Sequence, residues 1–176
     1  MSVEFYLKRL DSDDRPTFEC GDTDLNEFFS TDSVKYHKEL ISITYAAMCP
    51  KTNSVLGFFS VSNDAVRKED APNPSVLKRI MKPLNRAKRF SSTPAVKIGR
   101  LAICEKMKGN GLGTQLLDFI KVSFTTENKT GCRFIIVDAY KTATGFYERN
   151  GFELLSSKKE PGTTDLMYFD LINFVR

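Results

Sequence analysis

The sequence predicts a mixed α/β (α+β) fold with a partly antiparallel central sheet. Residues 41–49 and 55–62 are rich in β-branched and apolar side chains on either side of a short turn, which is typical of an antiparallel hairpin. Residues 134–137, Phe-Ile-Ile-Val, are continuously apolar, which indicates a strand buried on both faces with a parallel neighbour. Before that run, residues 96–103 fit a strand that a glycine cluster joins to a helix. These elements together predict a strand–helix–strand unit.

The N-terminal region predicts a strand followed by a capped helix. Residues 5–10 fit a short strand, and residues 11–21 fit a polar loop. Asp22 or Thr23 suits the first position of the helix, because an oxygen-bearing side chain there accepts a hydrogen bond from a free backbone N–H. The helix is expected to direct three apolar side chains inward, namely Leu25, Phe28 and Phe29.

The segment from residue 64 to residue 93 differs in composition from the rest of the chain. It contains three prolines, and a short helix is expected over residues 74–81. Two interpretations stay open for it, a solvated basic loop and a substrate-binding flap. Its basic side chains are Arg67, Lys68, Lys78, Arg79, Lys82, Arg86, Lys88 and Arg89.

The strand over residues 96–103 changes its alternation. Val96 and Ile98 share one face, whereas Leu101 and Ile103 follow in the opposite phase. One extra residue near positions 99–100 would produce this change, so we expect a β-bulge there. A bulge leaves some backbone N–H and C=O groups free for a ligand.

The glycine cluster follows directly, as Lys-Gly-Asn-Gly-Leu-Gly at residues 108–113. Glycines at the start of a helix let the backbone approach a ligand, and the free N–H groups favour phosphate. The spacing is neither a Walker loop nor a dinucleotide fingerprint, which would need glycine at Thr114. An ordinary strand-to-helix loop is the alternative. The helix is expected to bury Leu112, Leu116, Leu117, Ile120 and Phe124.

The C-terminal part predicts a helix over residues 143–150 that ends at Gly151. Final strands are expected over residues 152–155 and 165–170, with a turn at residues 161–162 between them.

Composition predicts one soluble, cytoplasmic domain over residues 1–176. Hydrophobic residues make up 41% and charged residues 27%, which are ordinary values for a globular chain. No membrane span or signal peptide is evident. Scattered cysteines and a single histidine, His37, argue against a metal site and a disulfide framework. The net charge of +4 permits phosphate-bearing ligands without identifying nucleic acid.

The glycine loop resembles the pyrophosphate motif of the GNAT acetyltransferase superfamily, which is Gln or Arg, two variable residues, Gly, one variable residue, then Gly or Ala. Lys108 departs from the motif's first position, since lysine keeps the charge but lacks the donor fork of arginine. The resemblance implies a GNAT-like mixed sheet with a bulged, splayed strand, helices on both faces, and acetyl-CoA as co-substrate without a metal. It assigns cofactor binding to Leu101, Ala102, Ile103, Lys108, Gly109, Asn110, Gly111, Leu112, Gly113 and Thr114.

A second segment, residues 143–152, resembles the family's Ala-x-x-Phe-Tyr-x-x-x-Gly-Phe pattern. This resemblance implies that Tyr147 is the general acid. A phenol with a pKa of about 10 stays protonated at neutral pH and can protonate a leaving thiolate whose thiol has a pKa of about 8.5. The alternative is an aromatic ring in the core, a role that Phe146 fits better.

No general base can be chosen from the sequence. Glu105, Asp138 and Glu148 are candidates by residue type only. An α-amino group with a pKa of about 8 is already partly neutral at neutral pH, whereas a lysine amine at about 10.4 needs more help. Absence of a base would therefore favour an α-amino acceptor.

The main prediction is an acetyl-CoA-dependent N-acetyltransferase that acts on a primary amine by direct attack. A module that binds CoA without catalysis is one alternative, since it would need the glycine loop but not Tyr147. Residues 18–28, with Phe-x-Cys-Gly before Leu-Asn-x-Phe, resemble a toxin-like subgroup. That resemblance implies a second alternative, acetylation of the α-amino group of aminoacyl-tRNA, with tRNA and an antitoxin as partners. A homodimer is one option for the oligomeric state.

Overall fold

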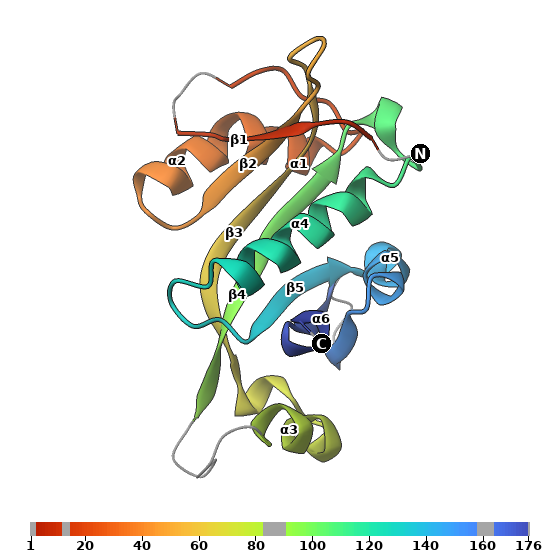
Figure 1. The fold of residues 1–176 in the computed structure, drawn as a ribbon. Coiled ribbons are helices and arrows are strands. Elements are labelled where there is room, and N and C mark those ends of the chain that lie inside the picture. The colour runs from red at the N-terminus through yellow and green to blue at the C-terminus, as the bar shows by residue number, and fades with distance from the viewer. Residues whose placement is uncertain (1–2, 12–14, 83–90, 158–163, 176) are drawn as a thin grey trace. The chain divides into compact units, whose positions relative to one another are not determined.

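The structure, a computed structural model, describes residues 3–11, 15–82, 91–157 and 164–175. The chain forms a mixed sheet of seven strands in the order β1-β2-β3-β4-β5-β7-β6. Figure 1 labels strands β1 to β5. The predicted mixed α/β fold is therefore confirmed.

The chain divides into two compact units. The first comprises residues 1–62 and 98–120, and the second comprises residues 63–97 and 121–176. Each unit has its own hydrophobic core. The expected single domain over residues 1–176 stays a prediction. Three long elements contribute residues to both units: β3 (Val55–Arg67), β4 (Ser92–Ile103) and α4 (Leu112–Thr126).

The first unit contains the predicted hairpin. Strand β2 (Ile43–Met48) lies between β1 (Tyr6–Arg9) and β3, antiparallel to both. Strand β3 continues to Arg67, beyond the predicted end at residue 62. The polar residues that end the apolar run therefore do not end the strand.

The helical segment of this unit begins as predicted and continues further. Asp22 is the N-cap, and its carboxylate accepts a hydrogen bond of 3.1 Å from the backbone N–H of Leu25. Helix α1 (Thr23–Glu27) passes into a π-helical turn, η1 (Phe28–Asp32), and then into α2 (Ser33–Lys38). Phe28 and Phe29 are buried, as expected.

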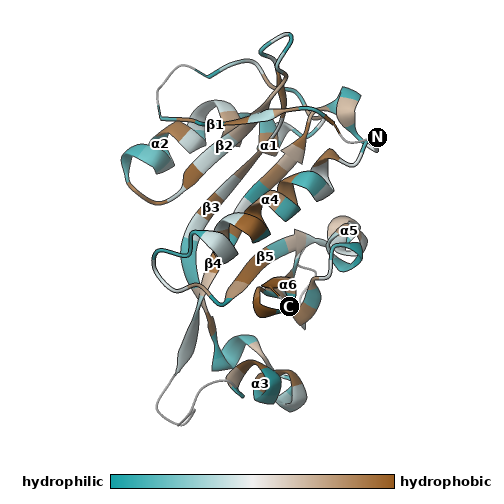
Figure 2. Ribbon diagram, in the orientation of Figure 1, coloured by the Kyte–Doolittle hydropathy of each residue, from teal (hydrophilic) through white to brown (hydrophobic). Residues whose placement is uncertain are grey.

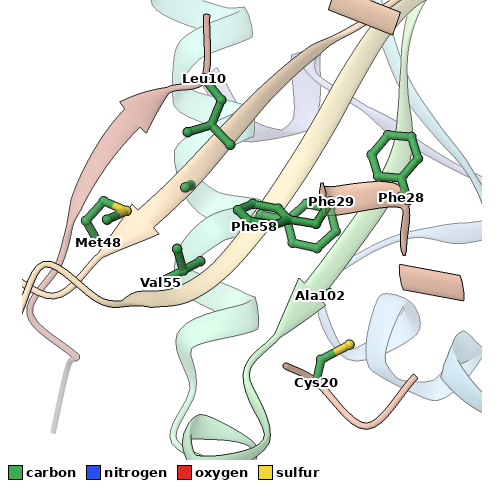
Figure 3. Close-up of a cluster of buried hydrophobic side chains, with 9 residues drawn as sticks. Leu10, Cys20, Phe28, Phe29, Met48, Val55, Phe58 and Ala102 are labelled. Carbon is green, nitrogen blue, oxygen red and sulfur yellow. The ribbon is translucent and has the colours of Figure 1, made fainter. Parts of the chain in front are cut away.

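Phe58 on β3 lies at the centre of the first core (Figure 3). Its ring centroid is 4.9 Å from that of Phe29 and 5.1 Å from that of Phe18. Phe28 stacks on the same ring at 6.1 Å. Packing of these rings holds the helical segment against β3. The buried members of the cluster are Leu10, Cys20, Phe28, Phe29, Ala46, Met48, Val55, Phe58 and Ala102.

Gly57 brings the backbones of β3 and β4 close together. A Cβ atom at this position would lie only 2.8 Å from the carbonyl oxygen of Ala102 and 2.9 Å from Cδ1 of Ile103. Further along, the N–H of Cys104 donates a 2.9 Å hydrogen bond to the carbonyl oxygen of Leu56. These contacts fix the end of β4, where cofactor binding is expected.

The second unit is built on β5 (Phe134–Tyr140), β7 (Thr164–Asp170) and β6 (Glu153–Ser157), each antiparallel to the next. Residues 134–137 are all buried, and Figure 2 shows β5 mostly in the brown of hydrophobic residues. Beside Phe134, Arg133 makes a bidentate ion pair with Asp170, with Nε at 2.6 Å.

Helix α3 (Pro74–Met81) confirms the helix expected inside the basic segment. It follows a short 3-10 turn, η2 (Lys68–Asp70). Arg79 donates hydrogen bonds to the Glu153 carboxylate and to the hydroxyl of Tyr168. Lys78 and Lys82 are exposed. Three of the predicted basic residues, Arg86, Lys88 and Arg89, lie outside the described residues.

The last helices are short. The 3-10 turn η5 (Lys141–Ala143) leads into α5 (Thr144–Arg149), and the N–H of Gly151 closes the helix with a 2.9 Å hydrogen bond to the carbonyl oxygen of Glu148. This end was predicted, whereas α6 (Ile172–Val175) was not. The turn expected at residues 161–162 lies outside the described part of the chain.

Among the described residues, no helix has the length and apolar character needed to cross a membrane. Within the same ranges, no three His, Cys, Asp or Glu side chains gather as a metal site.

Candidate active site

The glycine loop of the first unit exposes bare backbone. A 3-10 turn, η4 (Glu105–Met107), connects β4 to this loop. Gly109 and Gly111 have φ angles of +80° and +79°, a conformation that other residues rarely adopt. A Cβ atom at either position would meet no other atom within 4 Å. The peptide groups of the loop are therefore open to a ligand, which fits the predicted pyrophosphate site.

Helix α4 starts directly behind the loop. The N–H of Gln115 bonds to the carbonyl oxygen of Gly111 at 3.1 Å, so the N–H groups of residues 112–114 precede the first helical hydrogen bond. They lie at the positive end of a 15-residue helix. Most of the predicted apolar face is confirmed, because Leu112, Leu116, Leu117 and Ile120 are buried, whereas Phe124 is half-buried. This burial holds the helix N-terminus in place.

Lys108 ties the loop to the N-terminal region. Its ammonium donates a 2.6 Å hydrogen bond to the carbonyl oxygen of Cys20. In addition, the N–H of Glu105 bonds to the carbonyl oxygen of Glu19 at 3.2 Å. The sequence motif placed Lys108 at the pyrophosphate position but gave no sign of this contact, because the two residues are 88 positions apart.

Asn26 stabilises the segment that receives Lys108. Its Oδ1 accepts a 3.0 Å hydrogen bond from the N–H of Cys20, and its Nδ2 donates to Oε1 of Glu19 at 2.6 Å. The same Glu19 oxygen accepts from the N–H of Gly21 at 2.7 Å. These two hydrogen bonds, that of Asn26 first, lower the pKa of Glu19. These hydrogen bonds join the Phe-x-Cys-Gly motif to the Leu-Asn-x-Phe motif. We call the segment of residues 18–26 that they stabilise the bracket.

Cys20 within this bracket is a packed residue. Its side chain is 3% exposed, and burial raises the pKa of its thiol. A protonated, buried thiol suits packing better than nucleophilic chemistry.

The end of β4 carries the residues expected to bind the pantetheine arm and the acetyl group. Ala102 is buried, whereas Leu101 and Ile103 are half-buried. Ile98 and Ala102, four residues apart, are both buried, so burial does not follow the phase change of the sequence pattern. The bulge expected at residues 99–100 stays a prediction.

Tyr147 lies in the second unit, on α5. Its side chain is 6% exposed and contacts two rings edge-on, Phe146 at 5.1 Å and Phe152 at 5.3 Å. Burial raises the pKa of the phenol, so the group stays protonated throughout the physiological range. This protonation state suits an acid catalyst, and the ring packing suits a core aromatic as well.

The three carboxylates considered as bases have different surroundings. Asp138 forms a 2.6 Å ion pair with Lys97, so an ammonium engages the carboxylate. Glu105 and Glu148 are exposed to solvent. None of the three is singled out as a base. Nε2 of His37 lies 3.8 Å from Oδ1 of Asp11.

Comparison with known proteins supports the resemblance stated from the motifs. A family model described as "Acetyltransferase (GNAT) domain" matches residues 86–165, a stretch that holds both the glycine loop and Tyr147. Residues 86–165 therefore resemble a GNAT acetyltransferase domain, as the two sequence motifs predicted.

Its relatives include a tRNA-acetylating toxin. Over 146 residues the chain is 27% identical to a tRNA-acetylating toxin from Mycobacterium tuberculosis, and the match covers 82% of this chain and 81% of the relative. AtaT complexed with acetyl-methionyl-tRNA has the same fold, with a TM-score of 0.77, 23% identity and 98% coverage of both chains. AtaTR bound with acetyl-CoA gives a TM-score of 0.75 at 24% identity, covering 97% of this chain and 96% of that one.

Proposed function

We propose that the protein transfers the acetyl group of acetyl-CoA to the α-amino group of an aminoacyl-tRNA. The observation that carries this proposal is the match to a tRNA-acetylating toxin over 82% of this chain and 81% of the relative. The sequence alone favoured an unspecified primary amine, and the relatives favour the tRNA alternative.

The first unit provides groups that fit acetyl-CoA. The open peptides at Gly109 and Gly111 and the free N–H groups of α4 suit the pyrophosphate. The backbone groups of residues 101–103 are proposed to bond the pantetheine arm. Acetyl-CoA supplies a thioester that an amine can attack.

The chain's own groups then have limited chemical tasks. The α-amine is partly neutral at neutral pH, so it can attack the thioester carbonyl without a strong base and lose its proton to water. The carbon–sulfur bond breaks, and we infer that the Tyr147 hydroxyl gives its proton to the leaving thiolate. The phenol regains a proton from solvent. Its raised pKa keeps it in the donating form before each turnover.

Exposed cations of the second unit support an RNA acceptor. Lys68 on η2 and Lys78 on α3 are exposed, and so is Lys82 directly after α3. Such side chains bind phosphates, and their contribution should weaken as salt rises. The flap interpretation of this basic segment fits the proposal, and the solvated-loop interpretation remains open.

The test is acetylation of charged tRNA by the purified protein. A mixture of aminoacylated tRNAs is incubated with acetyl-CoA, and the aminoacyl groups are analysed by mass spectrometry, with Tyr147→Phe as the control. N-acetylated aminoacyl-tRNA in the wild-type sample, at a much lower level with Tyr147→Phe, supports the proposal. Acetylation of free amines or proteins but not of tRNA would instead support the main prediction from the sequence, an N-acetyltransferase acting on another primary amine. Binding of acetyl-CoA without any transfer would favour the non-catalytic module.

A partner protein follows from the same family relationship. The structure of an AtaT mutant toxin has been solved bound to the C-terminus of the antitoxin AtaR. A structure of KacTA has been solved in complex with DNA. We infer that this chain is also restrained by an antitoxin. Induced expression of the chain alone should arrest growth in a host, whereas Tyr147→Phe should not. The expected cytoplasmic location and the option of a homodimer stay predictions.

A further inference from the structure

Arg100 lies in the first unit, directly before the β4 residues expected to hold the thioester. Its Nη1 donates a 2.9 Å hydrogen bond to the carbonyl oxygen of the preceding Gly99. Its Nη2 lies 4.0 Å from the carboxylate of Asp24 on α1. Its Nε is buried and has no hydrogen-bond partner among the described residues. A guanidinium has five N–H donors, so the described residues engage only part of its capacity.

Another arginine of the chain makes a bidentate ion pair and serves as a comparison for Arg100. Arg133 binds Asp170 with both Nε and Nη2, at 2.6 Å and 2.9 Å. The single long contact between Arg100 and Asp24 does not reach this geometry. Because burying an unpaired donor is unfavourable, the Arg100 arrangement points to a ligand that completes it.

The guanidinium is nevertheless held in a defined place. Its central carbon lies 5.1 Å from the centroid of the Phe28 ring, a cation–π arrangement. Phe28 is itself buried in the first core, stacked on Phe58. The Arg100 side chain remains 41% exposed, so an anion can reach it from solvent. A guanidinium that is held in place, has an unpaired donor and is accessible to solvent is preorganised to bind an anion.

We propose that Arg100 binds a phosphate oxygen at the 3′ end of the acceptor aminoacyl-tRNA, and that Asp24 competes with this phosphate for the guanidinium. This inference rests on the proposed function and names the residue that would position its acceptor. Strand rise is about 3.3 Å per residue, so Arg100 stands within about 7 Å of Ala102 along β4. The amine must reach the thioester there, and the terminal phosphate is the charged group of the tRNA that lies nearest to that amine. The fork of a guanidinium matches phosphate oxygens.

A structural role is the alternative. In that case the contacts to Phe28 and Asp24 would serve only to hold α1 on β4. The two roles differ in what a substitution changes, because a positioning residue alters the KM for the acceptor and a structural one alters stability and acetyl-CoA affinity.

The experiment measures initial rates with charged tRNA at saturating acetyl-CoA. Arg100→Gln should raise the KM for tRNA roughly tenfold or more, as expected for a lost charge-assisted hydrogen bond, with kcat and the Kd for acetyl-CoA little changed. Arg100→Lys should recover part of the loss. Asp24→Asn should lower the KM for tRNA, because it removes the carboxylate that competes for Arg100. Glu27→Gln, an exposed carboxylate on the same helix, is the matched control for net charge and should not reproduce that decrease.

A small acceptor pair isolates the phosphate. The 3′-aminoacyl ester of adenosine is compared with and without a 5′-phosphate. The wild-type enzyme should prefer the phosphorylated ester, and Arg100→Gln should lose that preference. Thermal unfolding of each variant shows whether the fold is kept.

Each other outcome overturns the inference. Equal KM values for wild type and Arg100→Gln, with an active wild type, would reject Arg100 as the phosphate ligand and leave the proposed function intact. Loss of acetyl-CoA affinity with Arg100→Gln and unchanged acceptor KM would establish the structural role. A wild type that acetylates peptides but no charged tRNA would reject both the proposed function and the inference.

Discussion

The Lys108 ammonium and the Cys20 carbonyl oxygen are joined by a 2.6 Å hydrogen bond. The bond connects the glycine loop to the bracket of residues 18–26, which Asn26 in turn holds through Cys20 and Glu19. The conformation of the cofactor loop therefore depends on a distant segment as well as on its own glycines.

Replacement of Lys108 by Met should release the loop from this bracket while keeping the aliphatic stem. Because the side chain lies near the surface, we expect a loss of about 0.5–1 kcal/mol in the free energy of unfolding. Acetyl-CoA affinity should fall several-fold, because the loop must be ordered on binding. Urea unfolding and calorimetry measure the two effects. Lys106→Met, at an exposed neighbouring position, is the control, and an equal loss there would show that only net charge matters.

Substitution of Gly111 by Ala should weaken acetyl-CoA binding through the backbone. The φ of +79° costs a side-chain-bearing residue about 1–2 kcal/mol, although the added methyl meets no protein atom. Gly131, with a φ of +76° and equally open surroundings, is a matched control in the second unit. Calorimetry should show weaker binding only for Gly111→Ala, while both variants lose similar stability. Unchanged affinity in Gly111→Ala would argue against this loop as the pyrophosphate site.

Tyr147→Phe should lower kcat by about 10²–10⁴, the usual effect of removing an acid catalyst, and leave the Kd for acetyl-CoA unchanged. Tyr140→Phe is the control, since this exposed tyrosine ends β5 in the same unit. Steady-state kinetics with charged tRNA give the comparison. Full activity of Tyr147→Phe would mean that water or another group protonates the thiolate.

Alkaline titration should separate Tyr147 from ordinary tyrosines. Burial raises the pKa of its phenol above the reference value of about 10, so the group should still be protonated at that pH. The tyrosinate absorbance of wild type minus that of Tyr147→Phe should be near zero there. The free energy of unfolding should depend on pH for the same reason. Below about pH 10 Tyr147 contributes no pH dependence, and above it the free energy of unfolding falls, because the unfolded phenol releases a proton that the folded one keeps. A half-ionised Tyr147 at pH about 10 would contradict this account.

Local elements could be predicted because their signals lie in adjacent residues. The carboxylate of Asp22 caps α1 by bonding three positions ahead, and the end of α5 depends on Gly151 beside it. The buried run of β5 is visible in four consecutive letters. Within the candidate site, the glycine cluster is visible in the sequence, and glycine permits the positive φ angles found at Gly109 and Gly111.

Contacts between distant residues could not be predicted. Lys97 and Asp138 are 41 positions apart, and Arg79 and Tyr168 are 89 positions apart. No periodicity records such pairs, because they form only when separate elements pack. For the same reason the sequence could name Asp138 as a candidate base but could not show that an ammonium engages it.

Saturation mutagenesis should select different residues at Gly57 and at Gly109, two glycines of the first unit. At Gly57 the obstacle is a carbonyl oxygen 2.8 Å from any added Cβ, so each of the other residue types meets the same collision. At Gly109 the space is open and only the torsion angle is demanding. Asn and Asp tolerate that torsion better than other residues. Survivors selected for a folded chain should therefore retain Gly alone at position 57 and accumulate Asn and Asp at position 109.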